Sequence, residues 1–248
     1  MHPILFRIGK VSVYSYGFMM ALGIAVAVVG MRRMFKQNGY PEEKLYDLAL
    51  VAVISGLIGS RLFYVVFYAW DAFLENPLMF FNLQGGGLVF YGSFLGGLVG
   101  GIVYLWRQKM PFWEVADMAA PYLALAYAIG RVGCFLNGCC YGKPTSLPWG
   151  VVFPGIGGVA RHPTQIYSSL AALGLFVFLS WLYSRRHFSG QVFLCYVAGY
   201  ALIRFIIEFW RENLVLWAGL TVGQVMGLAA ILLTLPFYMV LKRGIRHG

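Results

Sequence analysis

Long apolar stretches recur along almost the whole sequence, and they leave few folds open to the chain. Windows of about 20 apolar residues predict membrane-spanning helices near residues 15–35, 46–69, 87–106, 113–131, 165–184, 190–210 and 216–241. Hydrophobic residues make up 60% of the chain and charged residues 11%, whereas about a quarter of a soluble domain is charged. The sequence therefore predicts an all-α polytopic membrane protein with about seven transmembrane helices, organised as one integral membrane domain over residues 1–248.

Lysines and arginines in the connecting loops predict how the helices are oriented. With the N-terminus outside, the inner loops hold 11 of the 19 basic residues and the outer side holds six, while Arg61 and Arg204 lie within predicted spans. The positive-inside rule therefore favours an N-out, C-in orientation. Most of the net charge of +10 follows from this topology and from attraction to anionic lipid, so no nucleic-acid partner is expected.

A polar ladder runs along the sixth apolar stretch and just beyond it. Its residues have the spacing i, i+4, i+8 and i+11: Tyr200, Arg204, Glu208 and Arg211. At about 100° per residue, a helix places them on one face. A charge inside a bilayer costs at least about 2.5 kcal/mol, so such charges usually face a cavity with a polar ligand or partner. The alternative is a structural Arg204–Glu208 pair that holds helices together, which leaves Arg211 without an obvious partner.

Glycines are concentrated between Gln84 and Gly101. Those inside the predicted span have the spacing of close helix packing: Gly92, Gly96, Gly97, Gly100 and Gly101. Gly85, Gly86 and Gly87 precede the span, where they predict a loop whose bare backbone can approach a ligand.

A second unusual segment, residues 131–164, is predicted to be a long outer loop. Arg131 and Asn137 stand beside glycines there, and their donors suit phosphate oxygens or ester carbonyls. A loop of about thirty residues without obvious structure is itself typical of a functional region.

Three cysteines of this segment leave several interpretations open. Cys134, Cys139 and Cys140 could bind a metal, could form a disulfide between Cys134 and one of the others, or could stay buried free thiols. The spacing C-x4-C-C lacks the paired pattern of zinc ligands and only His162 is nearby, so no metal site is predicted.

The segment from Gly130 to Gly142 resembles the signature of the prolipoprotein diacylglyceryl transferases, a family of bacterial membrane enzymes. The matching residues are Gly130, Arg131, Gly133, Phe135, Asn137, Gly138 and Gly142. The resemblance covers nearly the full length, and it includes Tyr16-Gly17, Gly59-Ser60-Arg61, Gly86-Gly87-Leu88, residues 161–167 and the polar ladder. Several separate motifs in one order make it specific.

The resemblance implies transfer of the diacylglyceryl group of phosphatidylglycerol to the lipobox cysteine thiol of a secreted preprotein, with release of glycerol phosphate. Arginines would face the negative charge that grows on the departing phosphate. The implied catalytic residues are Arg131, Arg204, Tyr91 and Glu208. The residues expected to bind phosphatidylglycerol are Arg131, Asn137, Tyr16, Tyr200, Arg211, Gly86, Gly87 and His162. No cofactor is expected, because the lipid already carries its leaving group.

The base that takes the thiol proton is the point at which this chain departs from the pattern. Some relatives place a histidine where this chain has Tyr91, and an ordinary tyrosine is a poor base at neutral pH. His162 is another candidate, with a hydrogen-bonded structural histidine as its alternative. Cys134 and Cys139 replace polar or acidic residues of many relatives, so no family role is carried over to them.

The expected location is the bacterial cytoplasmic (inner) membrane, with the active site toward the outer side. The helices would surround a central cavity open sideways to lipid, and the 131–164 loop would cap it. The rival hypothesis is an anion or lipid transporter that uses the same buried arginines without breaking bonds.

Overall fold

The computed structural model describes residues 1–9, 11–82, 86–213, 215–217 and 219–244, so Gln84 and Gly85 lie outside the described residues. The helices of this part are α1 (Ser15–Gln37), α2 (Glu42–Tyr68), α3 (Trp70–Glu75), the 3₁₀ helix η1 (Pro77–Phe81), α4 (Phe90–Arg107), α5 (Phe112–Asn137), α6 (Thr164–Tyr183), α7 (Gln191–Glu208) and α8 (Val222–Gly244). The strands are β1 (Ile4–Ile8), β2 (Val11–Tyr14), β3 (Val151–Val152), β4 (Ala160–Arg161), β5 (Val215–Trp217) and β6 (Leu220–Thr221).

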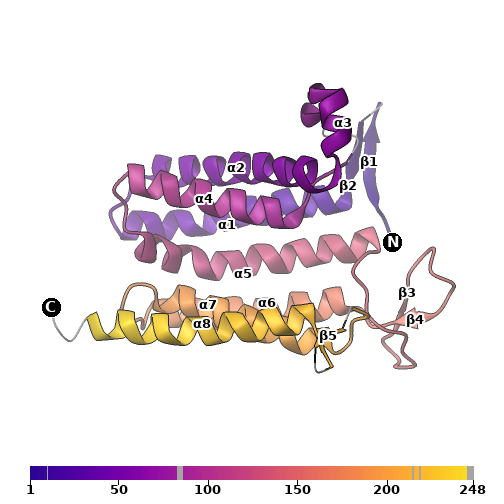
Figure 1. Ribbon diagram of the computed structural model, residues 1–248. Coiled ribbons are helices and arrows are strands. Elements are labelled where there is room, and N and C mark those ends of the chain that lie inside the picture. The colour runs from indigo at the N-terminus through magenta and orange to yellow at the C-terminus, as the bar shows by residue number, and fades with distance from the viewer. Residues whose placement is uncertain (10, 83–85, 214, 218, 245–248) are drawn as a thin grey trace. The chain divides into compact units, whose positions relative to one another are not determined.

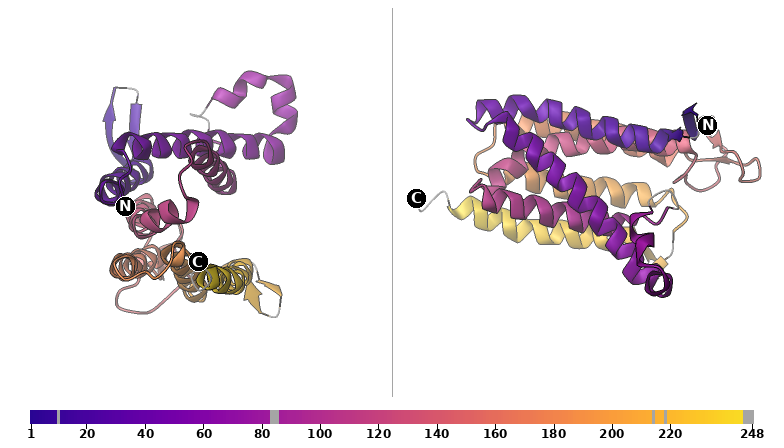
Figure 2. Two further views of the ribbon diagram at one scale, coloured as in Figure 1. Left: turned by 90° about the vertical axis from the view of Figure 1, so that its left-hand side faces the viewer. Right: turned by 90° about the horizontal axis from the view of Figure 1, so that it is seen from above.

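Each predicted span corresponds to a helix, which confirms a mostly helical, polytopic membrane protein (Figure 1). In the described chain, 6 helices are long and apolar enough to cross a membrane, and α4 is not among them. A seventh span through α4 therefore stays a prediction, as does the N-out orientation. The antiparallel hairpins β1–β2, β3–β4 and β5–β6 were not predicted from the sequence. The first of them leads directly into α1 (Figure 2).

Two predicted boundaries were wrong for local reasons. The last helix begins at Val222 rather than near residue 216, because Thr221 and Gln224 form a capping box. The Thr221 backbone N–H donates to Gln224 Oε1 at 3.0 Å, and the Gln224 N–H donates to Thr221 Oγ1 at 3.3 Å. Helix α5 continues to Asn137, and Gly138 directly after it has a φ of 74°, the left-handed conformation typical after a helix C-terminus. Arg131 and Asn137 therefore lie in a helix, and the predicted loop begins after them.

The chain divides into two compact units, one of residues 1–31 and 116–248 and one of residues 32–115. The single membrane domain predicted over residues 1–248 stays a prediction.

Helices α2 and α4 of the 32–115 unit pack backbone to backbone through glycines (Figure 1). A Cβ atom on Gly96 would lie 2.3 Å from the Ser55 carbonyl oxygen, and one on Gly92 would lie 2.3 Å from the Gly59 carbonyl oxygen. Only glycine allows helices this close. The packing interpretation is also confirmed at Gly100, where a Cβ would lie 2.1 Å from Ser55 Oγ, and at Gly97, where it would lie 3.2 Å from the Ala52 carbonyl oxygen. A Cβ on Gly101, in contrast, would meet Leu48 at an ordinary 3.8 Å.

Arg61, the other arginine within an apolar stretch, is buried in α2 and surrounded by carbonyl groups. It donates to the carbonyl oxygens of Phe80 at 2.8 Å, Asn82 at 2.8 Å, Gly86 at 2.7 Å and Gly87 at 3.2 Å, and also to that of Met79. The carbonyl groups of the segments that lead into α4 thus satisfy the hydrogen-bond donors of the buried Arg61 side chain.

Helices α6, α7 and α8 of the other unit lie alongside one another (Figure 1, Figure 2). Its core brings together side chains of α5, α6 and α7, namely Ala120, Ala124, Leu179 and Val192. Asp117 is buried beside this core, and its carboxylate accepts hydrogen bonds from the Gly190 N–H at 2.8 Å and the Phe193 N–H at 2.9 Å. These bonds satisfy donors at the start of α7 and fix α5 against it.

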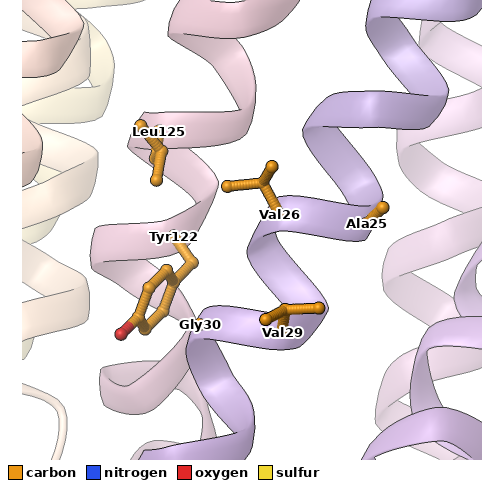
Figure 3. Close-up of a pocket in the computed structure, with 6 residues that line it drawn as sticks. All are labelled: Ala25, Val26, Val29, Gly30, Tyr122 and Leu125. Atoms are coloured by element: carbon orange, nitrogen blue, oxygen red, sulfur yellow. The ribbon is translucent and has the colours of Figure 1, made fainter.

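An apolar pocket of about 380 Å³ lies between α1 and α5 (Figure 3). Its lining residues are Ala25, Val26, Val29, Gly30, Tyr122 and Leu125. The Tyr122 ring crosses so close to Gly30 that a Cβ there would lie 2.0 Å from a ring carbon. None of these lining residues is charged, so the arginines do not border this pocket.

Candidate functional site

Within the unit of residues 1–31 and 116–248, the positive charges of three of the predicted arginines repel one another. Arg131 lies in α5, Arg204 in α7, and Arg211 in the turn after α7. Burial lowers the pKa of the Arg211 guanidinium, and the positive charges of Arg204 and Arg131 lower it further. The structure therefore concentrates three guanidinium groups in one region, where an anion would relieve their repulsion.

Tyrosines connect two of these arginines. The guanidinium carbon of Arg131 lies 4.8 Å from the centre of the Tyr127 ring, and the two side chains are also hydrogen-bonded. The Tyr127 ring meets the Tyr200 ring edge-on, with centroids 5.1 Å apart. The positive charges of both Arg131 and Arg204 interact electrostatically with the hydroxyl group of Tyr200. Tyr127 was not predicted from the sequence, although its i, i+4 relation to Arg131 was a usable signal.

The Arg204–Glu208 pair of the polar ladder exists as an i, i+4 ion pair within α7. Arg204 Nη2 is 3.0 Å from Glu208 Oε2, and the exposed fractions of the two side chains are 26% and 1%. The buried carboxylate also accepts hydrogen bonds from Thr221 Oγ1 at 3.0 Å and from Asn213 Nδ2. Glu208 is thus held from three directions, while Arg204 remains partly exposed. This geometry suits a residue that aligns an arginine, and sequence reasoning missed the roles of Asn213 and Thr221.

The fourth member of the predicted ladder was placed incorrectly on the helix. Helix α7 ends at Glu208, and the Arg211 N–H donates to the Glu208 carbonyl oxygen at 3.1 Å in the turn that follows. Within the described part of the chain, the buried Nε atom of Arg211 has no hydrogen-bond partner. A buried charged donor left unsatisfied is costly, so this group is suited to a ligand acceptor.

Tyr16 joins the same region from the first turn of α1. The charge of Arg131 acts on its hydroxyl, and the Tyr16 Cα would lie 3.4 Å from a Cβ placed on Gly133. Gly133 thus allows α1 to approach the turn of α5 that carries Arg131. Asn137 is the last residue of α5 and is half-buried, and its predicted contact with lipid stays a prediction.

His162 has the surroundings of a structural histidine. Its Nδ1 lies 3.2 Å from the Tyr167 hydroxyl oxygen, which accepts a hydrogen bond from Trp149 Nε1 at 2.9 Å. Its backbone carbonyl accepts from the Gly142 N–H at 2.9 Å. These contacts favour the structural alternative over the role of a base, and binding of lipid by His162 stays a prediction.

Tyr91, Gly86 and Gly87 belong to the 32–115 unit, so their place beside the arginines stays a prediction. Gly86 and Gly87 have φ values of 81° and 77°, in the left-handed region that favours glycine. A Cβ on Gly87 would lie 2.5 Å from Arg61 Nη1, so the close packing against Arg61 also favours glycine at this position. Tyr91 lies in the first turn of α4 and is 53% exposed.

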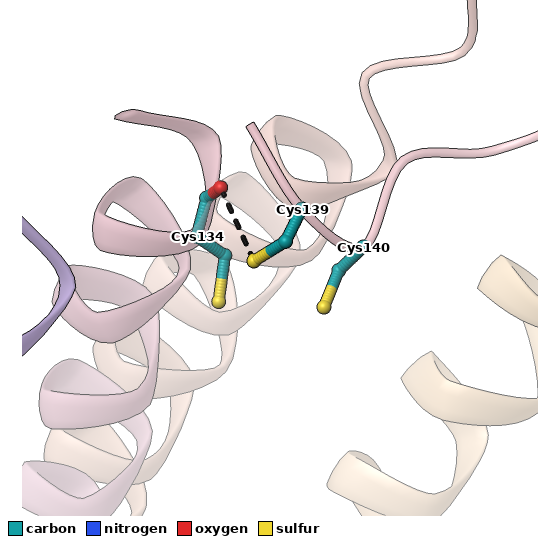
Figure 4. A group of neighbouring side chains, drawn as sticks. All are labelled: Cys134, Cys139 and Cys140. Atoms are coloured by element: carbon teal, nitrogen blue, oxygen red, sulfur yellow. Dashed lines mark hydrogen bonds between the residues drawn. The ribbon is translucent and has the colours of Figure 1, made fainter. Parts of the chain in front are cut away.

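The three cysteines after Arg131 are brought together as free thiols (Figure 4). The sulfur atoms of Cys134, Cys139 and Cys140 all lie within 4.8 Å of one another. Hydrogen bonds from the other two thiols lower the pKa of the Cys140 thiol, and the charges of Arg131 and Arg211 act in the same direction. The cysteine cluster is thus part of the same electrostatic environment as the arginines.

The spanning helices and this region define a class, a multi-pass α-helical membrane protein with a cluster of partly buried arginines and tyrosines. The family model for prolipoprotein diacylglyceryl transferase matches residues 3–240. The chain therefore belongs to the prolipoprotein diacylglyceryl transferase family.

Relatives from distant bacteria agree with this assignment. The phosphatidylglycerol–prolipoprotein diacylglyceryl transferase of Clostridium tetani is 39% identical over 217 residues, which are 86% of this chain and 86% of the relative. The enzyme of the same name from Bordetella parapertussis is 36% identical over 250 residues, covering 97% of this chain and 95% of the relative. That of Geobacter sulfurreducens is 36% identical over 248 residues, with the same two coverages.

Proposed function

We propose that this chain transfers the diacylglyceryl group of phosphatidylglycerol to the thiol of the lipobox cysteine of bacterial prolipoproteins, the first step of lipoprotein maturation. The names of the relatives support this substrate pair. The observation that carries the proposal is the mutual proximity of Arg131, Arg204 and Arg211 in one compact unit, with a buried donor of Arg211 left free among the described residues. An anionic phospholipid head is a ligand that suits such a cluster.

The reaction makes a thioether and breaks a phosphate ester. The thiolate sulfur attacks the glycerol carbon that bears the phosphodiester, the C–O bond breaks, and the electron pair leaves with glycerol phosphate. Negative charge therefore grows on the phosphate oxygens. Arg131 and Arg204 each offer paired donors to these oxygens, and their fields are stronger where water is scarce.

The remaining residues of the cluster would position the substrate. Glu208 holds Arg204 through their 3.0 Å ion pair. Tyr16, Tyr200 and Asn137 would orient the lipid oxygens, and Arg211 would bind the head group. From the other unit, the backbone at Gly86 and Gly87 would approach the lipid, and Tyr91 would act on the acceptor thiol. His162 would bind lipid at the outer edge of the site.

The substrates determine the location that we propose. Both a two-tailed lipid and a membrane-anchored peptide must reach the arginines, so the site would lie in a cavity open sideways to the bilayer. It would face the outer side of the cytoplasmic membrane, and the segment after α5, up to residue 164, would cap it. Phosphatidylglycerol carries its own leaving group, so the proposed reaction needs no cofactor.

A reconstituted assay tests this function. The purified chain, supplied with phosphatidylglycerol and a lipobox peptide, should yield a thioether-linked diacylglyceryl peptide and an equal amount of glycerol phosphate, both measured by mass spectrometry. A peptide with serine in place of the cysteine is the matched control and should give no product. Folded protein that yields no thioether but moves an anion across liposomes would reject the proposal in favour of a transporter.

A further inference from the structure

The cysteine cluster of Cys134, Cys139 and Cys140 has the dimensions of a metal site. Its three sulfur atoms lie within 4.8 Å of one another. Sulfurs bound to one tetrahedral ion at about 2.3 Å lie about 3.8 Å apart, so side-chain shifts of about 1 Å would bring all three into coordination. Figure 4 shows the three side chains extending from the chain in the same direction. The spacing C-x4-C-C did not predict this geometry.

A fixed reversal of the chain creates the cluster. After α5, Gly138 and Cys140 both adopt the left-handed conformation, with φ values of 74° and 65°. Such a conformation is uncommon in a residue other than glycine. The Cys139 N–H donates to the Cys134 carbonyl oxygen at 3.1 Å, which closes the turn. This turn brings the thiols of Cys139 and Cys140 close to the thiol of Cys134.

Helix α6 holds the same turn from outside. Gln165 Nε2 donates to the Cys139 carbonyl oxygen at 2.6 Å, and Thr164 Oγ1 donates to the Cys140 carbonyl oxygen at 2.8 Å. Both donor residues are almost completely buried, at 0% and 1% exposure. The backbone of two of the three cysteines is therefore fixed before any ligand arrives, which favours binding because little order has to be gained.

Charge also suits a soft cation held by thiolates. Three thiolates and one divalent ion carry a net charge of −1, and Arg131 and Arg211 are near enough to act on Cys140. Thiolate ligands select soft or borderline ions such as Zn²⁺, Cd²⁺ and Cu⁺, whereas Mg²⁺ and Ca²⁺ prefer oxygen. Three protein ligands leave a fourth tetrahedral position open.

We propose that Cys134, Cys139 and Cys140 form a binding site for one thiophilic metal ion of the Zn²⁺ class, coordinated through three thiolates. Binding would release the protons that the thiols still carry and would break the 3.6 Å hydrogen bond from Cys139 Sγ to the Cys134 carbonyl oxygen. The site goes beyond the proposed transfer reaction, and its test does not depend on that reaction.

A titration of the reduced, full-length protein with Cd²⁺ tests the proposal. One ion per chain should bind with a sulfur-to-metal charge-transfer band and with proton release, and excess Mg²⁺ should not compete. Each of Cys134→Ser, Cys139→Ser and Cys140→Ser should weaken binding at least about tenfold. Cys195→Ser is the matched control, because this half-buried free cysteine of α7 lies outside the cluster, and it should bind like the parent protein.

A second measurement on the unaltered protein keeps the proposal testable where a variant does not fold. Bound Cd²⁺ should protect the three cluster thiols from alkylation, as mapped by mass spectrometry, and should leave Cys195 reactive. Equal alkylation with and without the metal would overturn the site. A disulfide between two of the three cysteines in protein isolated without reductant would also overturn it, since the ligands would then be oxidised.

Discussion

The guanidinium groups of Arg131 and Arg204 are held by different partners, Tyr127 in one case and Glu208 in the other. If both face the departing phosphate, Arg131→Ala and Arg204→Ala should each lower kcat/KM at least about 100-fold, as loss of one charge-stabilising donor does in other enzymes. The thioether assay measures the rate, and thermal unfolding checks that the variants fold. Lysine at either position should restore part of the rate, because it keeps the charge without the paired donors. Unimpaired turnover in an alanine variant would remove that arginine from the site.

Tyr91 provides a separate test at the scale of one hydroxyl group. If this hydroxyl takes or donates a proton in the reaction, Tyr91→Phe should lower kcat by about 100-fold or more while leaving the fold unchanged. Tyr104→Phe is the matched control on the same helix, since its hydroxyl contacts Asp47 at 3.4 Å and has no proposed role. If Tyr91→Phe turns over at the full rate, its hydroxyl is neither the base nor an essential donor.

Contacts between residues of one helix could be predicted from the sequence better than contacts that depend on how the chain folds. The i, i+4 spacing indicated the Arg204–Glu208 pair, and the same rule could have found Tyr127 beside Arg131. The support of Glu208 by Asn213 and Thr221 depends on a hairpin that no periodicity in the sequence announces. The cysteine cluster likewise depends on left-handed backbone at Cys140, which residue spacing does not reveal.

The positions of the helices could be predicted from hydropathy, because each membrane span needs many apolar residues. The ends of the helices depend on a few local contacts, which hydropathy does not show. The start of α8 is set by the Thr221–Gln224 capping box, a signal present in the sequence but outweighed by the apolar residues before it. The end of α5 was predicted six residues early, at Arg131 rather than Asn137. The glycines there indicated a loop, but Gly133 is instead a helix position that packs on Met19 of α1.

The contact of α2 with α4 leads to a prediction for a pair of glycines on one helix. Gly96→Ala should destabilise the protein by about 1–3 kcal/mol, because the added methyl group would meet the Ser55 carbonyl oxygen at 2.3 Å. Gly101→Ala should be tolerated or should stabilise slightly, since its Cβ meets only Leu48 at 3.8 Å and alanine favours a helix. Thermal unfolding in detergent measures both. Equal effects of the two substitutions would contradict close backbone packing as the role of Gly96.

For the whole molecule, the number of spans decides on which sides of the membrane the two termini lie. An odd number puts them on opposite sides, as the N-out, C-in prediction requires, and an even number puts them on the same side. Among the residues that the structure describes, six helices meet the length and hydropathy of a span, so the parity depends on α4, an 18-residue helix rich in glycine. Hydropathy alone cannot decide this case, because glycines that let α4 pack against α2 also lower its apolar content.

Labelling three positions around α2 and α4 resolves the parity. In a variant without native cysteines, Lys36→Cys, Glu75→Cys and Lys109→Cys introduce thiols at exposed positions before α2, after α2 and after α4. A membrane-impermeant maleimide added to intact cells should label the position at Glu75 and should reach the other two only after permeabilisation. Opposite labelling at Lys36 and Glu75 serves as the control, because α2 is long and apolar enough to span. If the position at Lys109 is labelled together with that at Glu75, α4 does not cross the membrane, and the predicted arrangement with seven spans is wrong.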